Sequence, residues 1–309
     1  MVKLFMDNVT VIKTKSGDLP IVFAGTISKK GVSKSSVSTT AGKELSAANF
    51  NLTFWKQGKN VEYALKLMGK EYITFHKDDY DVISATAWGE DADYVASLAP
   101  STQIVGCGVL RCTHGDSKDF ISLRIAKILR PLDGVESINE HGFPTKLVYD
   151  RFRPLSVNEG SLPVFVCGKT GKFAAKVFNV RNNHKVAHSQ LNFYKQSFGI
   201  DKIKKSLNCN QIAYESDTSA SLKITAWDFD ADTLVSKAPE SQIIAGGVAQ
   251  VSHTDQYGDS IDLTLRAFVP FAQQNSTRLQ KIVMDSGSDS DFLDADTSCC
   301  DVNEGEIFL

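Results

Sequence analysis

Apolar and polar residues alternate in the stretch YDVISATAW (80–88), most regularly from Ile83 to Ala87. Ile83, Ala85 and Ala87 fall on one face of an extended strand, whereas Trp88 falls on the other face among polar residues. Such alternation is typical of a strand with one face in a core and the other in solvent. We therefore predict a half-buried strand here, with a large indole on its outer face.

One short helix and four further strands are expected around this strand. The string GEDADYVASLAP after Trp88 predicts the helix, with Asp91 or Asp93 capping its first turn and Pro100 ending it. The polar stretch 29–46, rich in Gly, Ser, Thr and Lys, is typical of a loop. Apolar, β-branched runs predict the four strands over residues 19–28, 49–57, 103–111 and 119–129.

The same pattern occurs a second time along the chain. The strings of the first half and their counterparts in the second are SATAWGEDADYVASLAP (84–100) and KITAWDFDADTLVSKAP (223–239), LTFWKQ (52–57) and LNFYKQ (191–196), QIVGCGV (103–109) and QIIAGGV (242–248), KLFMDN (3–8) and KLVYDR (146–151), and DLPIVFAG (18–25) and SLPVFVCG (161–168). Duplication of this kind predicts two units of the same fold. We place the first unit at 1–131, a linker at 132–143, the second unit at 144–271 and a tail at 272–309.

Five strands with one helix between the third and the fourth follow the order of the OB-fold, a small Greek-key barrel. The small residues of GCG (106–108) and AGG (245–247) suit a sharply bent barrel strand, because a Cβ there would crowd the neighbouring backbone. We therefore predict an all-β chain made of two tandem OB-folds, followed by a disordered acidic tail.

Composition favours a soluble, cytoplasmic protein. Of the 309 residues, 42% are hydrophobic and 23% are charged, which is ordinary for a globular chain. No apolar run approaches the roughly 20 residues that cross a bilayer, and the polar-interrupted start is not a secretory signal. The six cysteines form no CxxC pair, and no second pair lies at zinc spacing, so we expect a reducing compartment and neither a metal nor another cofactor.

Charge is divided unevenly between the body and the tail. Residues 285–309 hold eight acidic residues and no Lys or Arg, which leaves 28 acidic against 34 basic residues, a net charge of +6, in 1–284. A basic body fits a polyanionic partner, and an acidic tail fits a segment that must not adhere to that partner. A tail that merely keeps an average domain soluble explains the same division.

Aromatic residues recur on the outer faces of the predicted strands in both copies. Trp88 and Trp227 end the third strand, and Trp55 and Tyr194 lie near the end of the second. A flat ring on a polar face can stack on an unpaired base, and each stacked base contributes about 1–3 kcal/mol. The alternative is that these rings pack under loops or cover the barrels.

Basic residues near these aromatics can contact phosphates and steer a polyanion toward the rings. The candidate DNA-binding residues are therefore Trp88, Trp227, Trp55, Tyr194, Lys56, Lys195, Lys223, Lys29, Lys30, Lys34, Lys172, Lys176 and Arg181.

The string TAWGEDADYVASLAPSTQIVGCGVL resembles the third strand, helix and fourth strand of the bacterial-type single-stranded DNA-binding proteins, the SSB family. The resemblance implies that Trp88 and Trp227 are base-stacking residues. It also implies that the tip EGEIFL docks on replication and repair proteins through Glu304, Glu306, Ile307, Phe308 and Leu309. Two barrels in one chain resemble the family form that reaches four barrels as a homodimer, and the divergence fits a phage or mobile-element version.

Other functions fit parts of the sequence. The repeated acidic pairs, Asp91 with Asp93 and Asp230 with Asp232, could hold a metal, but their place at a helix start favours capping. No P-loop, nucleophile elbow or HExxH string occurs, so we do not expect an enzyme. A recombination mediator or strand-annealing protein would also bind single strands, and an OB module for RNA would read the 2′-OH.

Overall fold

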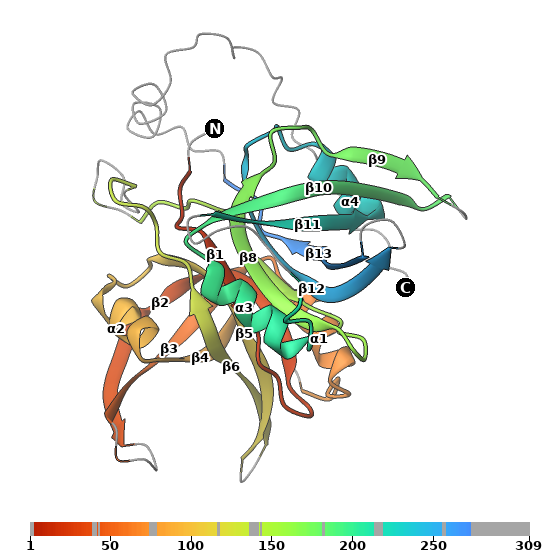
Figure 1. Cartoon of the computed structure of the whole chain (residues 1–309). Helices are drawn as coiled ribbons and strands as arrows, with labels where there is room; N and C mark the ends of the chain where they lie inside the picture. Colours follow the sequence, from red (N-terminus) through yellow and green to blue (C-terminus); the bar gives the residue numbers. More distant parts are fainter. Residues whose placement is uncertain are drawn as a thin grey trace.

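The computed structural model describes residues 3–38, 42, 44–73, 79–115, 118–135, 142, 144–180, 183–212, 219–254 and 258–272 (Figure 1). Within these residues the chain is mostly β, as the alternation predicts. In the same residues, no helix combines the length and the apolar character needed to span a bilayer. The tail and most of the expected linker lie outside the described residues.

The first repeat forms a closed five-stranded barrel. Its strands are β2 (Leu19–Ser38), β3 (Glu44–Trp55), β4 (Tyr80–Trp88), β5 (Gln103–His114) and β6 (Asp119–Ile128). They pair in the order β3-β4-β6-β5-β2, and β2 pairs with β3 to close the barrel. The pairing of β4 with β6 is parallel, and α2 (Glu90–Ser97) joins β4 to β5. This strand order confirms the predicted OB-fold.

The second repeat shows the same pairing order. Its elements are β8 (Leu162–Thr170), β9 (Lys176–Asn179), β10 (Lys185–Tyr194), β11 (Ser219–Trp227), α4 (Asp228–Val235), β12 (Gln242–Thr254) and β13 (Gly258–Phe268). The order is β8-β12-β13-β11-β10-β9, with β11 parallel to β13. β10 pairs with β8 at two positions and with β9 at four, whereas β2 pairs with β3 at nine, so the sheet of the second repeat closes less completely than that of the first.

Two features of the fold differ from the sequence-based expectation. The stretch 29–46 is not a loop: β2 runs on to Ser38 and β3 begins at Glu44, which makes a two-stranded arm (Figure 1). A helix after the second strand was not predicted in either repeat, yet the structure has α1 (Gly58–Leu67) and α3 (Ser197–Ser206) there. Val61, Ala64 and Leu65 bury one face of α1, a helical spacing that the sequence does contain.

The glycine-rich strands bend where the sequence predicts. An added Cβ at Gly108 or Gly247 would lie 2.3 Å from the carbonyl oxygen of Arg124 or Thr264 on the neighbouring strand. The strand register shifts at both places, immediately before each glycine. A residue with a side chain is therefore excluded at each bulge.

Two short strands are exchanged between the repeats. β1 (Asn8–Val11), from the first repeat, pairs with β8 of the second barrel, and β7 (Arg151–Pro154), from the second repeat, pairs with β2 of the first barrel. Strand pairing thus crosses the unit boundaries that we place from the sequence.

Equivalent side chains of the two repeats bind the segments that contain the exchanged strands. Gln103 accepts hydrogen bonds from the backbone N–H groups of Leu147 and Val148, and its counterpart Gln242 accepts from Leu4 and Phe5. The glutamine side chains at the starts of α1 and α3 act in the same way. Gln57 accepts a hydrogen bond from Phe152 N–H, and Gln196 accepts one from Val9 N–H. The exchange is therefore a symmetric feature of the duplicated chain.

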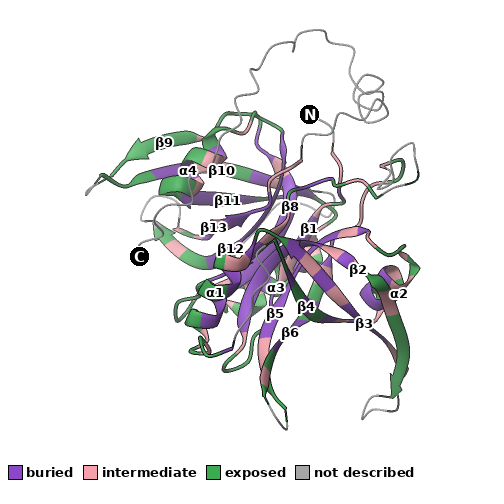
Figure 2. Ribbon diagram, turned by 180° about the vertical axis from the view of Figure 1, so that it is seen from behind, coloured by how far each residue is buried: buried purple, intermediate pink, exposed green. Residues whose placement is uncertain are grey.

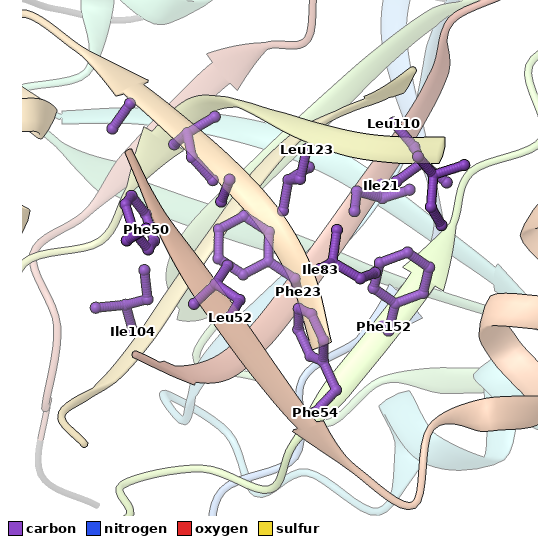
Figure 3. Packing of buried hydrophobic residues seen from close by; sticks show 14 of the residues in the cluster. Ile21, Phe23, Phe50, Leu52, Phe54, Ile83, Ile104, Leu110, Leu123 and Phe152 are labelled. Carbon is purple, nitrogen blue, oxygen red and sulfur yellow. The ribbon is translucent and has the colours of Figure 1, made fainter. Parts of the chain in front are cut away.

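The core consists of one cluster inside each barrel and a third cluster between the barrels. In the first barrel, Phe152 of β7 packs edge-on against Phe54, with ring centroids 5.2 Å apart (Figure 3). The third cluster combines residues of both repeats, including Val22 and Phe165. Buried positions accordingly concentrate where the two barrels meet (Figure 2). The repeats form one packed body.

Candidate nucleic-acid interface

The tryptophans that end β4 and β11 lie on the outer surface of their barrels. Trp88 is 36% exposed and Trp227 is 45% exposed, while Ala85 and Ala87 are buried beneath β4. In both repeats the strand ends at the indole, and the chain then turns into a helix, α2 or α4. Each ring is thus held at the end of a rigid strand and is accessible to a flat ligand.

A second pair of aromatics lies at the far end of the same surface. Trp55 is 48% exposed and Tyr194 is 55% exposed. Trp55 is opposite Tyr80 in the register of β3 and β4, and Tyr194 is opposite Ser219 in that of β10 and β11. The eight residue steps from Tyr80 to Trp88 correspond to about 26 Å at the usual strand rise.

The exchanged strands fix these second aromatics. The backbone N–H of Trp55 donates to Asp150 Oδ2 at 2.7 Å, and that of Tyr194 donates to Asp7 Oδ2 at 2.7 Å. The next residue in each repeat, Lys56 or Lys195, has a φ of 51°, which places it in the left-handed region. Lys195 Nζ lies 5.2 Å from the Tyr194 ring centroid. Each aromatic is therefore positioned by a carboxylate from the other repeat.

Polar side chains fill the surface between the two aromatic ends. Thr86 Oγ1 donates to Asn49 Oδ1 at 2.8 Å, and the equivalent Thr225 Oγ1 lies 3.1 Å from His188 Nδ1. Burial lowers the pKa of His188, and the nearby Lys223 lowers it further, so the imidazole is neutral near pH 7. This middle section offers hydrogen-bonding groups with little positive charge.

The predicted basic residues do not share one environment. Lys29, Lys30 and Lys34 lie on strand β2 and not in a loop, and all three are exposed. Lys34 Nζ forms an ion pair with Asp93 at 2.8 Å, and Lys223 Nζ forms one with Asp262 at 3.3 Å. A phosphate would compete with those carboxylates.

In the second repeat, Lys176 lies on β9 opposite His188, and Lys172 is exposed just before that strand. Arg181 lies outside the described residues. The predicted lysines therefore flank the aromatic surface on two different hairpins.

The acidic pairs after the tryptophans do not cap their helices through side-chain hydrogen bonds. Asp91 instead accepts from the backbone N–H of Ile128 and pairs with Lys127 Nζ at 3.2 Å, which ties α2 to β6. Burial raises the pKa of Asp230 to about 6, although Arg153 and other arginines oppose the shift. The expectation that Asp91 or Asp93 caps the helix is thus wrong, because Gly89 is the N-cap and both carboxylates lie inside the first turn.

Three potential metal ligands meet on the β5–β6 hairpin. Ligand atoms of Cys112, His114 and Asp119 lie within 4.8 Å of one another. Asp119 already accepts a hydrogen bond from Tyr72, and it pairs with His114 Nδ1 at 2.7 Å. The second repeat keeps the histidine–aspartate pair, His253 with Asp259, at 2.8 Å. The repeated element is therefore a histidine–aspartate contact across the hairpin.

Sequence reasoning missed one aromatic of this surface, Phe178 on β9. Phe178 is 50% exposed, and its ring centroid lies 5.9 Å from that of His188. The string KVFNV (176–180) gives no alternation of apolar and polar residues. Its only signal is that apolar residues occur in a stretch that the first repeat fills with Ser and Lys.

No family model and no curated protein sequence matches the chain. Among solved structures, the wild-type single-stranded DNA binding protein from Thermus aquaticus is 12% identical, with 84% of this chain and 95% of that chain covered and a TM-score of 0.26.

Two further matches cover a smaller share of this chain or of the matched chain. The SSB domain of a Synechococcus sp. protein is 13% identical over 37% of this chain and 98% of that chain, with a TM-score of 0.25. A replication protein A heterotrimer bound to ssDNA is 11% identical over 93% of this chain and 54% of that chain, with a TM-score of 0.21. These TM-scores are low, so the matches carry no conclusion on the function of this chain.

Proposed function

We propose that this protein binds single-stranded DNA without sequence preference. One observation carries the proposal: the same exposed indole, Trp88 or Trp227, ends the third strand of each barrel on an open polar surface. Aromatic rings on such a surface can stack any base, because every base has a π-face. Base pairs in a duplex hide those faces, so single strands are the preferred ligand.

Oligo-dT titration at several salt concentrations tests the proposal. We expect quenching of tryptophan fluorescence, tighter binding to oligo-dT than to a duplex of equal length, and an affinity that falls as salt rises. For single strands the slope of log K against log salt is about −0.7 for each phosphate neutralised. Equal affinity for duplex and single strand would contradict the proposal, and tighter binding to oligo-U would redirect it to RNA.

We further propose that the protein protects single strands during replication, recombination or repair in the cytoplasm, acting as a monomer or a homodimer. The acidic tail would recruit partner proteins through its tip, Glu304 to Leu309, which lies outside the described residues. In the free protein, the tail would rest on the basic body and be displaced by DNA.

Deleting residues 285–309 is therefore expected to tighten oligo-dT binding at low salt, because eight acidic residues no longer compete with phosphate. The gain should disappear at high salt, where exposed charges are screened. A deletion that leaves the affinity unchanged at every salt concentration would contradict the competition between tail and DNA.

A further inference from the structure

The two repeats differ at the end of the surface where the principal tryptophans lie. In the second repeat, β9, β10 and β11 place Phe178, Val186 and Trp227 side by side, since Val186 is opposite both aromatics in the strand registers. The equivalent row of the first repeat is Ser35, Ala47 and Trp88. We name the row in the second repeat the Phe178 platform.

The Phe178 platform is apolar and open at its aromatic ends. Phe178 is 50% exposed and Trp227 is 45% exposed, whereas Val186 between them is only 5% exposed. Val186 does not belong to the buried cluster inside the second barrel. All four residues of β9 are exposed (Figure 2). An apolar residue beneath two flanking rings produces a continuous surface, about 10 Å across at the usual spacing of strands.

The surroundings of the platform suit a nucleobase with its phosphate. His188, which contacts the Phe178 ring, is neutral near pH 7 and can donate or accept a hydrogen bond at a base edge. Lys176 lies two residues before Phe178 on β9, on the same face of the sheet, and is exposed. In the first repeat, Asn49 takes the place of His188, and no ring lies opposite Ala47 on β2.

We infer that the Phe178 platform is an additional nucleobase site, present in the second barrel alone, which makes that barrel the tighter of the two for single strands. This inference rests on the proposed function, because it assumes that the aromatic surface binds bases. A platform that supports two adjacent bases binds more strongly than a single indole, since each stacked base contributes separately.

Reciprocal substitutions between the repeats test the inference. The probe is a fluorescein-labelled oligo-dT of about 8 nucleotides, within the site size of one barrel, and its anisotropy is followed at fixed salt. Phe178→Ser should weaken binding by about 5- to 150-fold. The salt dependence should stay unchanged, because no charge is removed. Ser35→Phe, which builds the missing ring into the first repeat, should tighten binding, and a misfolded variant cannot produce that gain.

Phe173→Ser is the matched control, because Phe173 is 84% exposed but outside the platform. We expect this variant to bind like the wild type. If Phe178→Ser also binds like the wild type, or if Ser35→Phe brings no gain, the platform is overturned while the proposed function stands. A wild-type chain that ignores oligo-dT would instead overturn the proposed function itself.

Discussion

Replacing Trp88 and Trp227 together by alanine should weaken oligo-dT binding by roughly 30-fold to 10⁴-fold. Each exposed indole is expected to hold one base, and loss of a stacked base costs about 1–3 kcal/mol. The slope of affinity against salt should not change, because an indole neutralises no phosphate. Fluorescence anisotropy of labelled oligo-dT, at several salt concentrations, measures both quantities.

Two controls define what the double variant means. Replacing the same residues by phenylalanine keeps a stacking ring and should restore most of the affinity. Phe173→Ala removes an exposed aromatic residue outside the strands that carry both tryptophans and should leave binding unchanged. If the double alanine variant binds oligo-dT like the wild type, the indoles are not the base-binding groups.

Phe152→Ala should destabilise the first barrel by about 3–5 kcal/mol. Phe152 is fully buried in the core of the first barrel, although it belongs to the second repeat. Its loss removes the edge-on contact with Phe54 and leaves a cavity in the core, next to the strand that ends at Trp55. The shift in the midpoint of urea unfolding measures the effect.

The three tryptophans allow this effect to be assigned to one barrel. In a Trp227→Phe background, fluorescence reports only Trp55 and Trp88, which both belong to the first barrel. Phe152→Leu keeps most of the buried volume and should retain most of the stability. If Phe152→Ala leaves the unfolding of the Trp55 and Trp88 signal unchanged, the exchange of β7 does not support the first barrel.

Much of the fold follows from the sequence, because alternation decides which face of a strand is buried. Ile83, Ala85 and Ala87 are buried and Trp88 is exposed, as the pattern of β4 predicts. The bulges at Gly108 and Gly247 were also predictable, since only a missing Cβ fits against the next strand. Because the sequence is duplicated, each expectation for one repeat also applies to the other.

Strand exchange could not be read from the sequence. KLFMDN (3–8) and KLVYDR (146–151) resemble each other, so either segment fits either barrel equally well by pattern. Which barrel each segment joins depends on the path of the chain between the repeats and on the packing of the central cluster. The asymmetry at Phe178 was hidden for a different reason, because a run of apolar residues on an exposed hairpin has no periodicity to mark its outward face.

The exchange of β1 and β7 has a mechanical consequence. A nick between residues 135 and 144 would leave two fragments that stay interlocked, since each fragment supplies a strand to the sheet of the other. The two barrels therefore do not move independently of each other when a ligand binds. The aromatic surfaces of the two barrels thus keep one fixed mutual orientation.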